Sequence, residues 1–222
     1  MGLRSLLRTL YTAGQGVSVG IDASALMEAA AGTDPFALFE GWFQDARRAG
    51  IYLPETMTLA TATPGGAPSA RQVLLKGWGP AGFVFYTNYE SRKAAELAAN
   101  PRAALLMHWA TLHRQVRIEG AASRTSIEES EAYHRSRPRG SRLAAWASRQ
   151  SAVISGRDEL ERRFREEAAA HPGEDVPLPP FWGGYRVRPE RIEFWQGRAN
   201  RMHDRLLFER AGEEWQVVRL SP

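Results

Sequence analysis

From residue 34 onward, hydrophobic and polar residues alternate with the period of an α-helix. In DPFALFEGWFQDARRAG, which begins at Asp34 and ends at Gly50, aromatic side chains recur at the spacing of one helix face. These aromatic residues are Phe36, Phe39, Trp42 and Phe43. An Asp-Pro pair is a common helix start and glycine a common stop, so the pattern predicts an amphipathic helix with its aromatic face in the core.

The period shortens to that of strands after this helix. The stretch MTLATATPGGAPSARQVLLKGWGPAGFVFYTN contains three short runs of β-forming residues, separated by the turn sequences PGGAP and GWGPAG. It predicts an antiparallel meander of three strands. A helix in SRKAAELAANP and a strand pair in RAALLMHW and RQVRIEGAASR are predicted next.

A capping box is predicted before the next helix. Thr125 or Ser126 is followed three residues later by Glu128 or Glu129, the spacing at which side chains and backbone N–H groups cap each other. Residues 158–170 place charges four apart, typical of a solvated surface helix. The predicted ion pairs are Glu159 with Arg163 and Glu161 with Arg165.

The end of the chain again has strand character. A proline-rich connection, PGEDVPLPPFWGG, precedes three strand candidates, RVRPERIEFWQG, DRLLFER and EWQVVRL. No internal repeat interrupts this order. We therefore predict a mainly β fold, an antiparallel barrel with helices around it.

The amino-acid composition indicates a single globular domain but does not identify its function. The 222 residues are 43% hydrophobic, enough for one domain with its own core, and carry a net charge of +4. This modest excess, with an isoelectric point near 9.7, permits an anionic partner. The absence of cysteine excludes disulfides, thiolate catalysis and cysteine-bound zinc. No apolar run has the length of a membrane span and the opening residues lack the apolar block of a secretory signal, so we expect a cytoplasmic protein.

Common ligand motifs are missing from the sequence. The five histidines have neither HxH nor HExxH spacing, so no metal site is predicted. The chain also has no Walker loop and no GxGxxG turn after a strand. A bound phosphate would therefore be held by side chains.

Two basic segments offer such side chains. In SARQVLLK, Arg71 and Lys76 stand five residues apart, so on one strand they would face opposite sides and hold anions on either side of the sheet. Arg92 and Lys93 open the helix SRKAAELAANP, where the helix dipole already favours an anion. Cations at the N-terminus of a helix are unfavourable for the helix itself, so their presence indicates that an anion binds there. The alternative is that both side chains simply extend into solvent.

The stretch YHRSRPRGSRLAAWASRQS contains five arginines and no acidic residue. Tyr133, Arg137 and Ser141 are spaced by four and would share one face of a helix, although Pro138 interrupts it. Arginine forks and hydroxyl groups bind phosphate monoesters well. A nucleic-acid patch that uses Trp146 and Tyr133 for stacking, or a solvated loop, is equally compatible with these residues.

A fourth basic cluster lies in FWQGRANRMHDRLLFE. Trp195 could stack on a flat ligand, and in an extended chain Arg201, His203 and Arg205 share a face. A histidine between two arginines on one face indicates an anion or a reacting group among them.

These segments together resemble the pyridoxine/pyridoxamine 5′-phosphate oxidase family. The resemblance runs from about Asp34 to Pro222, through RQVLLK, FYTN, SRK, RQVRIEG, YHRSRPRGS, WASRQS, PLPPFWGGYRV, IEFWQG, RMHDR and RLSP. It implies an FMN-binding split β-barrel with a six-stranded antiparallel core, working as a homodimer with FMN at the subunit interface. Residues 34–222 would form the oxidase domain, and residues 1–33 a mobile, lid-like segment.

The resemblance also implies a reaction. Family members oxidise pyridoxine and pyridoxamine 5′-phosphates to pyridoxal 5′-phosphate by hydride transfer from C4′ to flavin N5, and dioxygen then reoxidises the flavin and yields hydrogen peroxide. The partners expected are therefore phosphorylated B6 vitamers and O2, with no nucleic acid and no membrane.

Functional residues follow from the matching motifs. The residues implied to bind FMN are Arg71, Val73, Leu74, Lys76, Tyr86, Thr87, Arg92, Lys93, Gln115, Gln150, Ser151, Trp195 and Arg205. Those implied to bind the substrate are Lys76, Tyr133, Arg137, Ser141, Arg201 and His203, with Arg8 and Tyr11 from a lid motif in LRTLY. Arg201 and His203 are also the implied catalytic residues, which would lie over the pyridine ring.

One departure from the family pattern and two alternative functions stand beside the proposed oxidase activity. Leu53 stands where the family usually has an acidic residue near the substrate, which could alter turnover or substrate choice. A flavin oxidase of the same fold with another substrate, as in the phenazine-pathway relatives, is the main alternative. Those relatives tend to lose the phosphate-binding lysine and the RPR arginines, whereas Lys76, Arg137 and Arg139 are present here. A non-catalytic flavin, pyridoxal phosphate or nucleic-acid binder is the third alternative.

Overall fold

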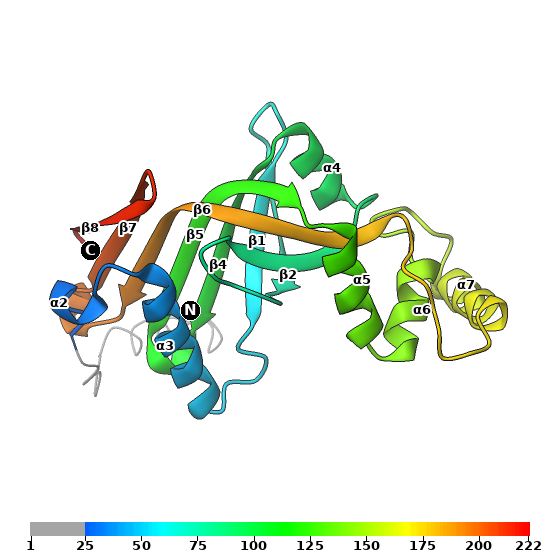
Figure 1. Cartoon of the computed structure of the whole chain (residues 1–222), viewed down its shortest axis with the longest axis horizontal. Coiled ribbons are helices and arrows are strands. Elements are labelled where there is room, and N and C mark those ends of the chain that lie inside the picture. Colours follow the sequence, from blue (N-terminus) through cyan, green and yellow to red (C-terminus); the bar gives the residue numbers. More distant parts are fainter. Residues whose placement is uncertain (1–24) are drawn as a thin grey trace, which may run out of the picture. The chain divides into compact units, whose positions relative to one another are not determined.

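The structure, a computed structural model, describes residues 25–222 in two compact units (Figure 1). The first unit comprises the described residues up to Tyr52 together with His108–Val116 and Ile192–Pro222. The second comprises Leu53–Met107 and Arg117–Arg191. Strands β4 (Arg102–Trp109), β5 (Arg114–Arg124) and β6 (Trp182–Gln196) contribute residues to both units.

Helix α3 (Pro35–Arg48) organises the core of the first unit and confirms the helix predicted from the aromatic pattern. The Asp34 carboxylate caps it by accepting from the Phe36 N–H at 2.8 Å. Phe39 is fully buried, and Trp42 packs edge-on against Phe194 of β6 with ring centroids 5.2 Å apart. The short helix α2 (Glu28–Ala31) precedes it, and Arg219 binds Glu28 through a 2.7 Å hydrogen bond from Nε.

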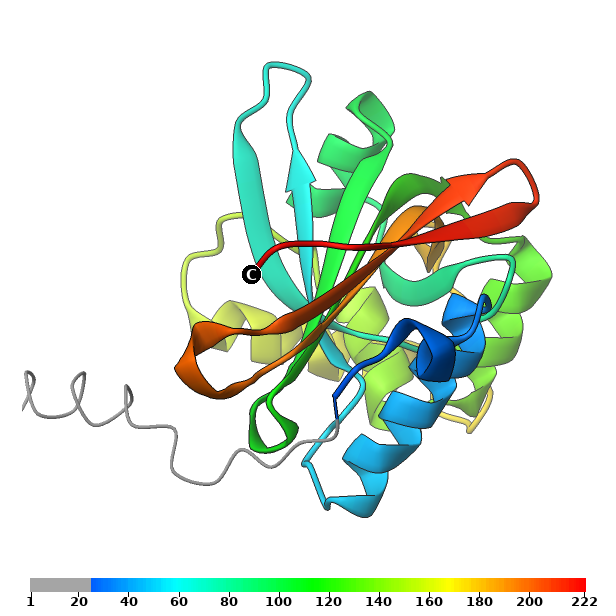
Figure 2. The same ribbon diagram turned by 90° about the vertical axis from the view of Figure 1, so that its left-hand side faces the viewer.

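The C-terminal strands of the first unit form a hairpin. β7 (Asp204–Ala211) pairs antiparallel with β8 (Glu214–Arg219), and Figure 2 shows the pair in red. Both strands were predicted. Two short 3-10 turns, η1 (Ala110–Leu112) and η2 (Ala199–Arg201), connect the strands of this unit.

The sheet of the second unit has the strand order β2-β1-β4-β5-β6, and β3 pairs separately with β6. Here β1 is Thr56–Ala62, β2 is Pro68–Leu74 and β3 is Phe83–Asn88. The prediction of a three-stranded meander is correct for the β1–β2 hairpin and wrong for β3. An isolated bridge, Gly77 to Val84, joins the segment after β2 to β3, whereas the whole length of β3 pairs with Trp182–Val187 of β6.

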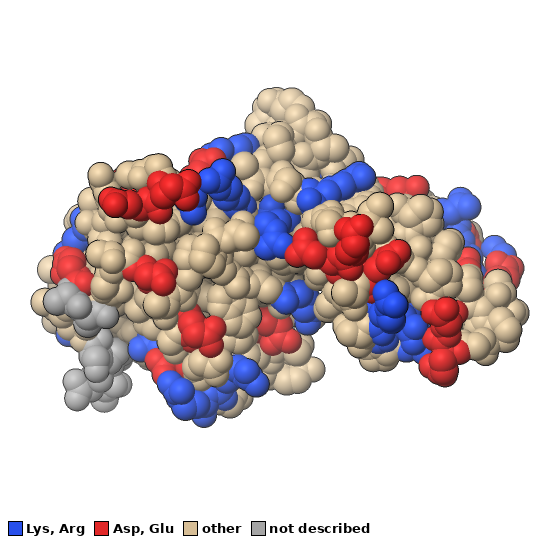
Figure 3. Space-filling model, viewed as in Figure 1, with Lys and Arg blue, Asp and Glu red and all other residues tan. Residues whose placement is uncertain are grey.

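Four helices belong to the second unit. They are α4 (Arg92–Ala99), α5 (Ile127–Ser136), α6 (Arg139–Ala147) and α7 (Arg157–Ala170). The capping box of α5 is confirmed with Ser126 and Glu129 as its members. In α7 the predicted pair of Glu159 and Arg163 forms, while Glu161 binds Arg157, one turn before it, in place of Arg165. Figure 3 shows charged side chains of both signs where Figure 1 places α7, as expected for a solvated helix.

The predicted fold class, antiparallel β with helices, is confirmed, although the sheet has eight strands where six were expected. The additional strands arise because the C-terminal β7–β8 hairpin extends the sheet beyond β6. Among residues 25–222, no helix combines the length and apolarity needed to cross a membrane.

Candidate functional site

A cavity of about 420 Å³ opens in the second unit, and its lining is basic and aromatic. The lining residues are Arg71, Gln72, Val73, Leu74, Lys76, Tyr86, Thr87, Lys93, Tyr133, Arg137, Gln150 and Trp182. Four of them are cations and none is a carboxylate. All but Gln72 and Trp182 were predicted to bind a ligand, so the fold gathers residues from β2, β3, α4, α5 and the loop after α6.

Arg71 and Lys76 line the same cavity, so the expectation that they serve opposite faces of a strand is wrong. The reason is that β2 ends at Leu74, before the alternation reaches Lys76. The chain then turns toward β3, with the Lys76 N–H bonded to the Val84 carbonyl at 2.8 Å. The Lys76 ammonium lies 3.9 Å from the carboxylate of Glu55.

Lys93 is a buried cation whose hydrogen-bond partners are uncharged. Its side chain lies in the first turn of α4 and its residue is only 8% exposed. Nζ donates to Gln150 Oε1 at 2.6 Å, Thr87 Oγ1 at 3.1 Å and Ser91 Oγ at 3.2 Å. Burial, reinforced by the nearby charge of Arg71, lowers the pKa of Lys93 to about 8. An anion in the cavity would reverse this shift.

Arg71 is fixed by a network that reaches behind the cavity wall. Its Nη1 donates to Thr61 Oγ1 at 2.6 Å and to the Leu59 carbonyl at 3.2 Å, and its Nη2 donates to Ser69 Oγ and to Glu96 Oε2. Glu96, on α4, is only 6% exposed and was not predicted from the sequence. Hydrogen bonds from Ser69 and Thr61 and the charge of Arg92 lower the pKa of Glu96 to about 2.

Arg92 and Ser151 lie next to the cavity lining. The Arg92 backbone N–H, at the start of α4, donates to Ser151 Oγ at 3.2 Å. Ser151 has a φ of 74°, a left-handed conformation that non-glycine residues rarely adopt outside functional turns. Arg92 and Ser151, two of the residues that the family resemblance implies to bind FMN, are therefore in direct contact, and Gln150, one residue before Ser151, lines the cavity.

Three nearly parallel aromatic rings form one wall of the cavity. Tyr86 stacks on Tyr133 with centroids 4.0 Å apart and on Trp182 at 5.6 Å. The guanidinium of Arg137 lies over Trp182, 4.6 Å from the ring centroid. Its Nη1 is buried with no hydrogen-bond partner among the described residues, and burial lowers the pKa of Arg137. A buried, unpaired guanidinium nitrogen is costly unless a ligand anion satisfies it.

The predicted helical face of Tyr133, Arg137 and Ser141 does not form. Helix α5 ends at Ser136, Arg137 has the extended backbone of a C-cap, and α6 begins only at Arg139, because Pro138 breaks the helix. Ser141 stands in the first turn of α6, half-exposed, and is not among the lining residues. Arg139 donates to the backbone carbonyls of residues 171 and 173.

The other described residues of the prediction belong to the first unit. The His203 ring lies 4.6 Å from that of Trp195, and its Nδ1 accepts from the Arg198 N–H at 3.1 Å. Arg205 donates from Nε to the buried Glu193 at 2.8 Å, and this hydrogen bond raises the pKa of Arg205. Gln115 is half-exposed near the start of β5.

Arg201 does not share a strand face with His203 and Arg205 as the sequence predicted. It ends η2 in a left-handed conformation, with a φ of 60°, and β7 starts only at Asp204. Arg201 is exposed. The predicted lid residues Arg8 and Tyr11 lie outside the described residues. Leu53 is 40% exposed and has a φ of 47° in the turn before β1.

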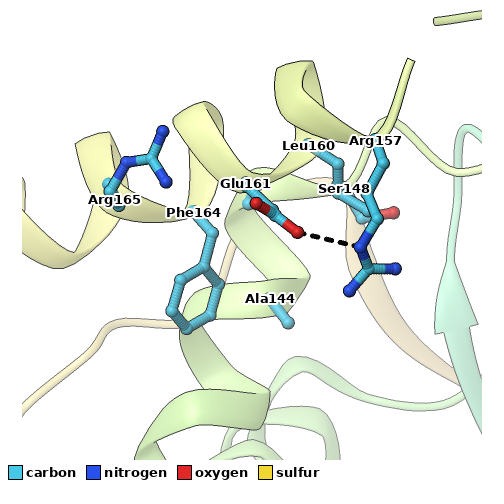
Figure 4. A pocket seen from close by; sticks show the side chains of 8 residues that line it. Ala144, Ser148, Arg157, Leu160, Glu161, Phe164 and Arg165 are labelled. Atoms are coloured by element: carbon cyan, nitrogen blue, oxygen red, sulfur yellow. Dashed lines mark hydrogen bonds and ion pairs between the residues drawn. The ribbon is translucent and has the colours of Figure 1, made fainter.

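A second cavity, of about 560 Å³, lies between α6 and α7 (Figure 4). Phe164 and Leu160 of α7 face Ala144 of α6 across it, and its lining is mainly apolar. The Glu161 carboxylate at its edge is already paired with Arg157 at 2.8 Å. The lining of this cavity has two arginines and a carboxylate, whereas that of the first has four cations and no carboxylate, so the first cavity is the candidate site.

Comparison with known proteins identifies relatives of the whole described fold. Residues 43–170 match the family model described as pyridoxamine 5′-phosphate oxidase, and residues 182–222 match the pyridoxine 5′-phosphate oxidase C-terminal dimerisation region. The chain is 62% identical over 199 residues to the pyridoxine/pyridoxamine 5′-phosphate oxidase of Rubrobacter xylanophilus, covering 90% of this chain and 92% of that protein. It is 50% identical over 222 residues to that of Colwellia psychrerythraea, covering all of both chains.

A solved structure shares the fold at lower identity. PhzG from Burkholderia lata 383, in complex with tetrahydrophenazine-1-carboxylic acid, superimposes with a TM-score of 0.84 at 30% identity, covering 90% of this chain and 99% of that one.

Proposed function

Because the chain belongs to the pyridoxine/pyridoxamine 5′-phosphate oxidase family, a family of oxidoreductases, we propose that it converts pyridoxine 5′-phosphate and pyridoxamine 5′-phosphate to pyridoxal 5′-phosphate with FMN as its cofactor. Both the cofactor and the substrates are phosphate monoesters with flat rings. The site must therefore supply cations for two phosphates and flat surfaces for two rings.

The observation that carries the proposal is the carboxylate-free, cationic lining of the 420 Å³ cavity. Lys93 has a lowered pKa and uncharged partners, so a phosphate dianion beside it would restore its ordinary preference for the charged form. Arg71 and Lys93, with Ser151 and the first turn of α4 beside them, fit the FMN phosphate. Tyr86, Thr87 and Gln150 line the same space.

A second group of lining residues fits the substrate. Lys76, Tyr133 and Arg137 line the cavity, and the orphaned Nη1 of Arg137 offers a donor to a second phosphate. Ser141, near the start of α6, is also proposed to bind the substrate phosphate, although it is not among the residues that line the cavity. The stacked wall of Tyr86, Tyr133 and Trp182 offers flat apolar surface of the kind that a pyridine or flavin ring contacts.

The residues of the first unit complete the proposed chemistry. The chemistry that bound FMN would supply is acceptance of the hydride, with dioxygen as the final electron acceptor and hydrogen peroxide as its product. Arg201 and His203 would orient the pyridine ring, while Gln115, Trp195 and Arg205 would contact the flavin. The buried Glu193 holds Arg205 in place for this role. We also propose that FMN lies at the interface of a homodimer, which the match to the dimerisation region supports.

A flavin oxidase with a non-phosphorylated substrate is the second candidate, and the similarity to PhzG favours it. That structure binds an aromatic carboxylic acid, tetrahydrophenazine-1-carboxylic acid. Lys76 and Arg137, both in the cavity lining, favour the phosphorylated substrate because a second phosphate needs cations beyond those assigned to FMN.

The test uses the purified full-length protein reconstituted with FMN. We expect a yellow protein that forms pyridoxal 5′-phosphate and hydrogen peroxide from both phosphorylated vitamers. Unphosphorylated pyridoxine, the matched control substrate, should have a kcat/KM lower by at least about tenfold, because each charge-assisted phosphate contact contributes about 1.5–3 kcal/mol. Yellow protein that leaves both phosphates unchanged and oxidises a reduced phenazine carboxylic acid would establish the second candidate. Failure to bind FMN would contradict both.

A further inference from the structure

Glu96 is a buried carboxylate placed directly behind the cations of the candidate site. It belongs to α4 but does not line the cavity. In the sequence it looks like any solvated glutamate of a short helix, whereas in the structure it is 6% exposed. Buried carboxylates are rare unless several donors satisfy them.

Four side chains donate hydrogen bonds to Glu96. Oε2 accepts from Thr61 Oγ1 and Ser69 Oγ, both at 2.5 Å, and from Arg71 Nη2 at 3.4 Å. Oε1 accepts from Arg92 Nε at 2.9 Å. One carboxylate thus ties β1, β2 and the start of α4 to the same point.

The same network determines the orientation of Arg71. Thr61 and Ser69 each donate to Glu96 and accept from Arg71, so their hydroxyl groups are oriented by the carboxylate and then by the guanidinium. A hydroxyl that donates to Glu96 must present its lone pairs elsewhere, and here it presents them to Arg71. Without Glu96, both hydroxyl groups could rotate and the Arg71 fork would lose its fixed geometry.

Charge balance supports the same role. Arg71, Arg92 and Lys93 bring three positive charges to this corner and Glu96 removes one, which leaves a net charge of +2. A phosphate monoester carries about −1.5 to −2 at neutral pH, so the corner matches it in charge. An uncompensated group of three cations would instead repel one another in the absence of a ligand.

We propose that Glu96 is a positioning residue for cofactor binding, which fixes Arg71 and Arg92 so that their donors meet the phosphate of FMN. This inference rests on the proposed function, in which Arg71 binds that phosphate. Glu96 acts through the arginines and contacts neither the flavin nor the substrate.

The experiment measures binding of FMN and of riboflavin to the full-length apoprotein by quenching of flavin fluorescence. Riboflavin has the same ring without the phosphate. For E96A we expect FMN affinity to fall by about tenfold or more, the equivalent of one charge-assisted contact, while riboflavin affinity stays unchanged. E96Q should bind FMN with an affinity between those of E96A and wild type, because an amide oxygen at the position of Oε2 keeps the bonds from Thr61, Ser69 and Arg71, whereas the amide nitrogen at the position of Oε1 cannot accept from Arg92. Glu90→Ala, which removes an exposed carboxylate just before α4, is the control and should match wild type.

Each other result contradicts the proposal in a defined way. If E96A and E96Q both bind FMN more tightly, Glu96 acts only as a negative charge that opposes the phosphate. If E96A loses FMN and riboflavin equally, the substitution disturbs the folding of the unit. E96Q, which keeps the bonds that Oε2 accepts, then decides, because an equal loss of both flavins there overturns the positioning role as well. Wild type that prefers riboflavin or binds neither flavin would instead contradict the proposed function itself, before any variant is compared.

Discussion

Lys93 shows how a single residue can link proton binding to ligand binding. It is buried among neutral oxygens, and its pKa of about 8 lies well below the ordinary 10.5. The ammonium form is therefore disfavoured in the folded apoprotein, and an anionic ligand would favour it again. Such a group makes both stability and affinity depend on pH, with opposite signs.

We predict that FMN affinity changes little between pH 7 and 8 and falls above pH 8. As pH rises through the lowered pKa, Lys93 loses its proton and FMN binding must take one up, so the Kd should rise by up to about tenfold per pH unit. Over the same range, from 8 to 10.5, the apoprotein should gain stability, because the unfolded state binds more protons than the folded state. Titrations of FMN at pH 7 to 9.5, with urea unfolding of the apoprotein, check both signs. K93M should remove the slope, and a K93M profile as steep as that of wild type would contradict the assignment.

Arg137 is the residue to test for substrate recognition. We predict that R137M raises KM for pyridoxine 5′-phosphate by about tenfold or more with a smaller change in kcat, because the lost contact is to the phosphate and not to the reacting carbon. Arg135→Met is the matched control. Arg135 is exposed, and its ion pair with Glu131 is weak because the two groups are 4.0 Å apart at the surface. Steady-state kinetics on the FMN-loaded enzymes check the prediction. Equal effects of the two substitutions would mean that only the general positive charge of the stretch matters.

Sequence reasoning at this scale selected residues that carry motifs and that line the cavity, and it missed residues whose place depends on packing. Arg71, Lys93 and Tyr133 were identified because their segments resemble a known family. Glu96 and Trp182 were missed. Glu96 has the appearance of a surface helix residue, and only the contact of α4 with the β1–β2 hairpin buries it.

At the scale of elements, β6 positions the aromatic wall through a pair of glycines. Gly183 and Gly184 are buried where β6 pairs with β3 and where residues around α5 approach. A Cβ on Gly184 would lie 2.5 Å from Thr125 Oγ1 and 2.9 Å from Tyr86 Cε1. The missing side chain therefore allows the start of α5 and the ring of Tyr86 to pack on this strand.

We predict that G184A destabilises the protein by about 1–3 kcal/mol, since its Cβ would meet the Thr125 side chain, which is hydrogen-bonded to Ser130, and the Tyr86 ring, which is stacked on Tyr133. Gly140→Ala is the control. A Cβ there meets nothing within 4 Å, and the position lies inside α6, so alanine should stabilise by about 0.5–1 kcal/mol. Urea unfolding measures both free energies. Two substitutions with the same sign would contradict the packing argument.

The elements themselves were largely predictable, and their pairing was less so. Helix α3, strands β4 and β5 and the capping box of α5 follow from local periodicity and side-chain chemistry, which the sequence displays directly. The partner of β3 does not, because β6 begins almost a hundred residues later and nothing in FVFYTN distinguishes it from the third strand of a meander. The helix break at Pro138 was visible, yet its effect on Ser141 depends on how α6 packs.

At the scale of the whole molecule, the match of residues 182–222 to a dimerisation region supports a homodimer. We predict that the full-length protein has the mass of two 24.7 kDa chains in solution and that its thermal midpoint rises with protein concentration, because a dimer is stabilised by mass action. FMN at one hundred times its Kd should add about 2.7 kcal/mol, which for a chain of this length raises the midpoint by roughly 5–11 °C. Light scattering and calorimetry at several protein concentrations, with riboflavin as the phosphate-free control, measure these effects. A monomeric mass, with a thermal midpoint that does not depend on protein concentration, would contradict the homodimer. FMN would then have to bind within one subunit.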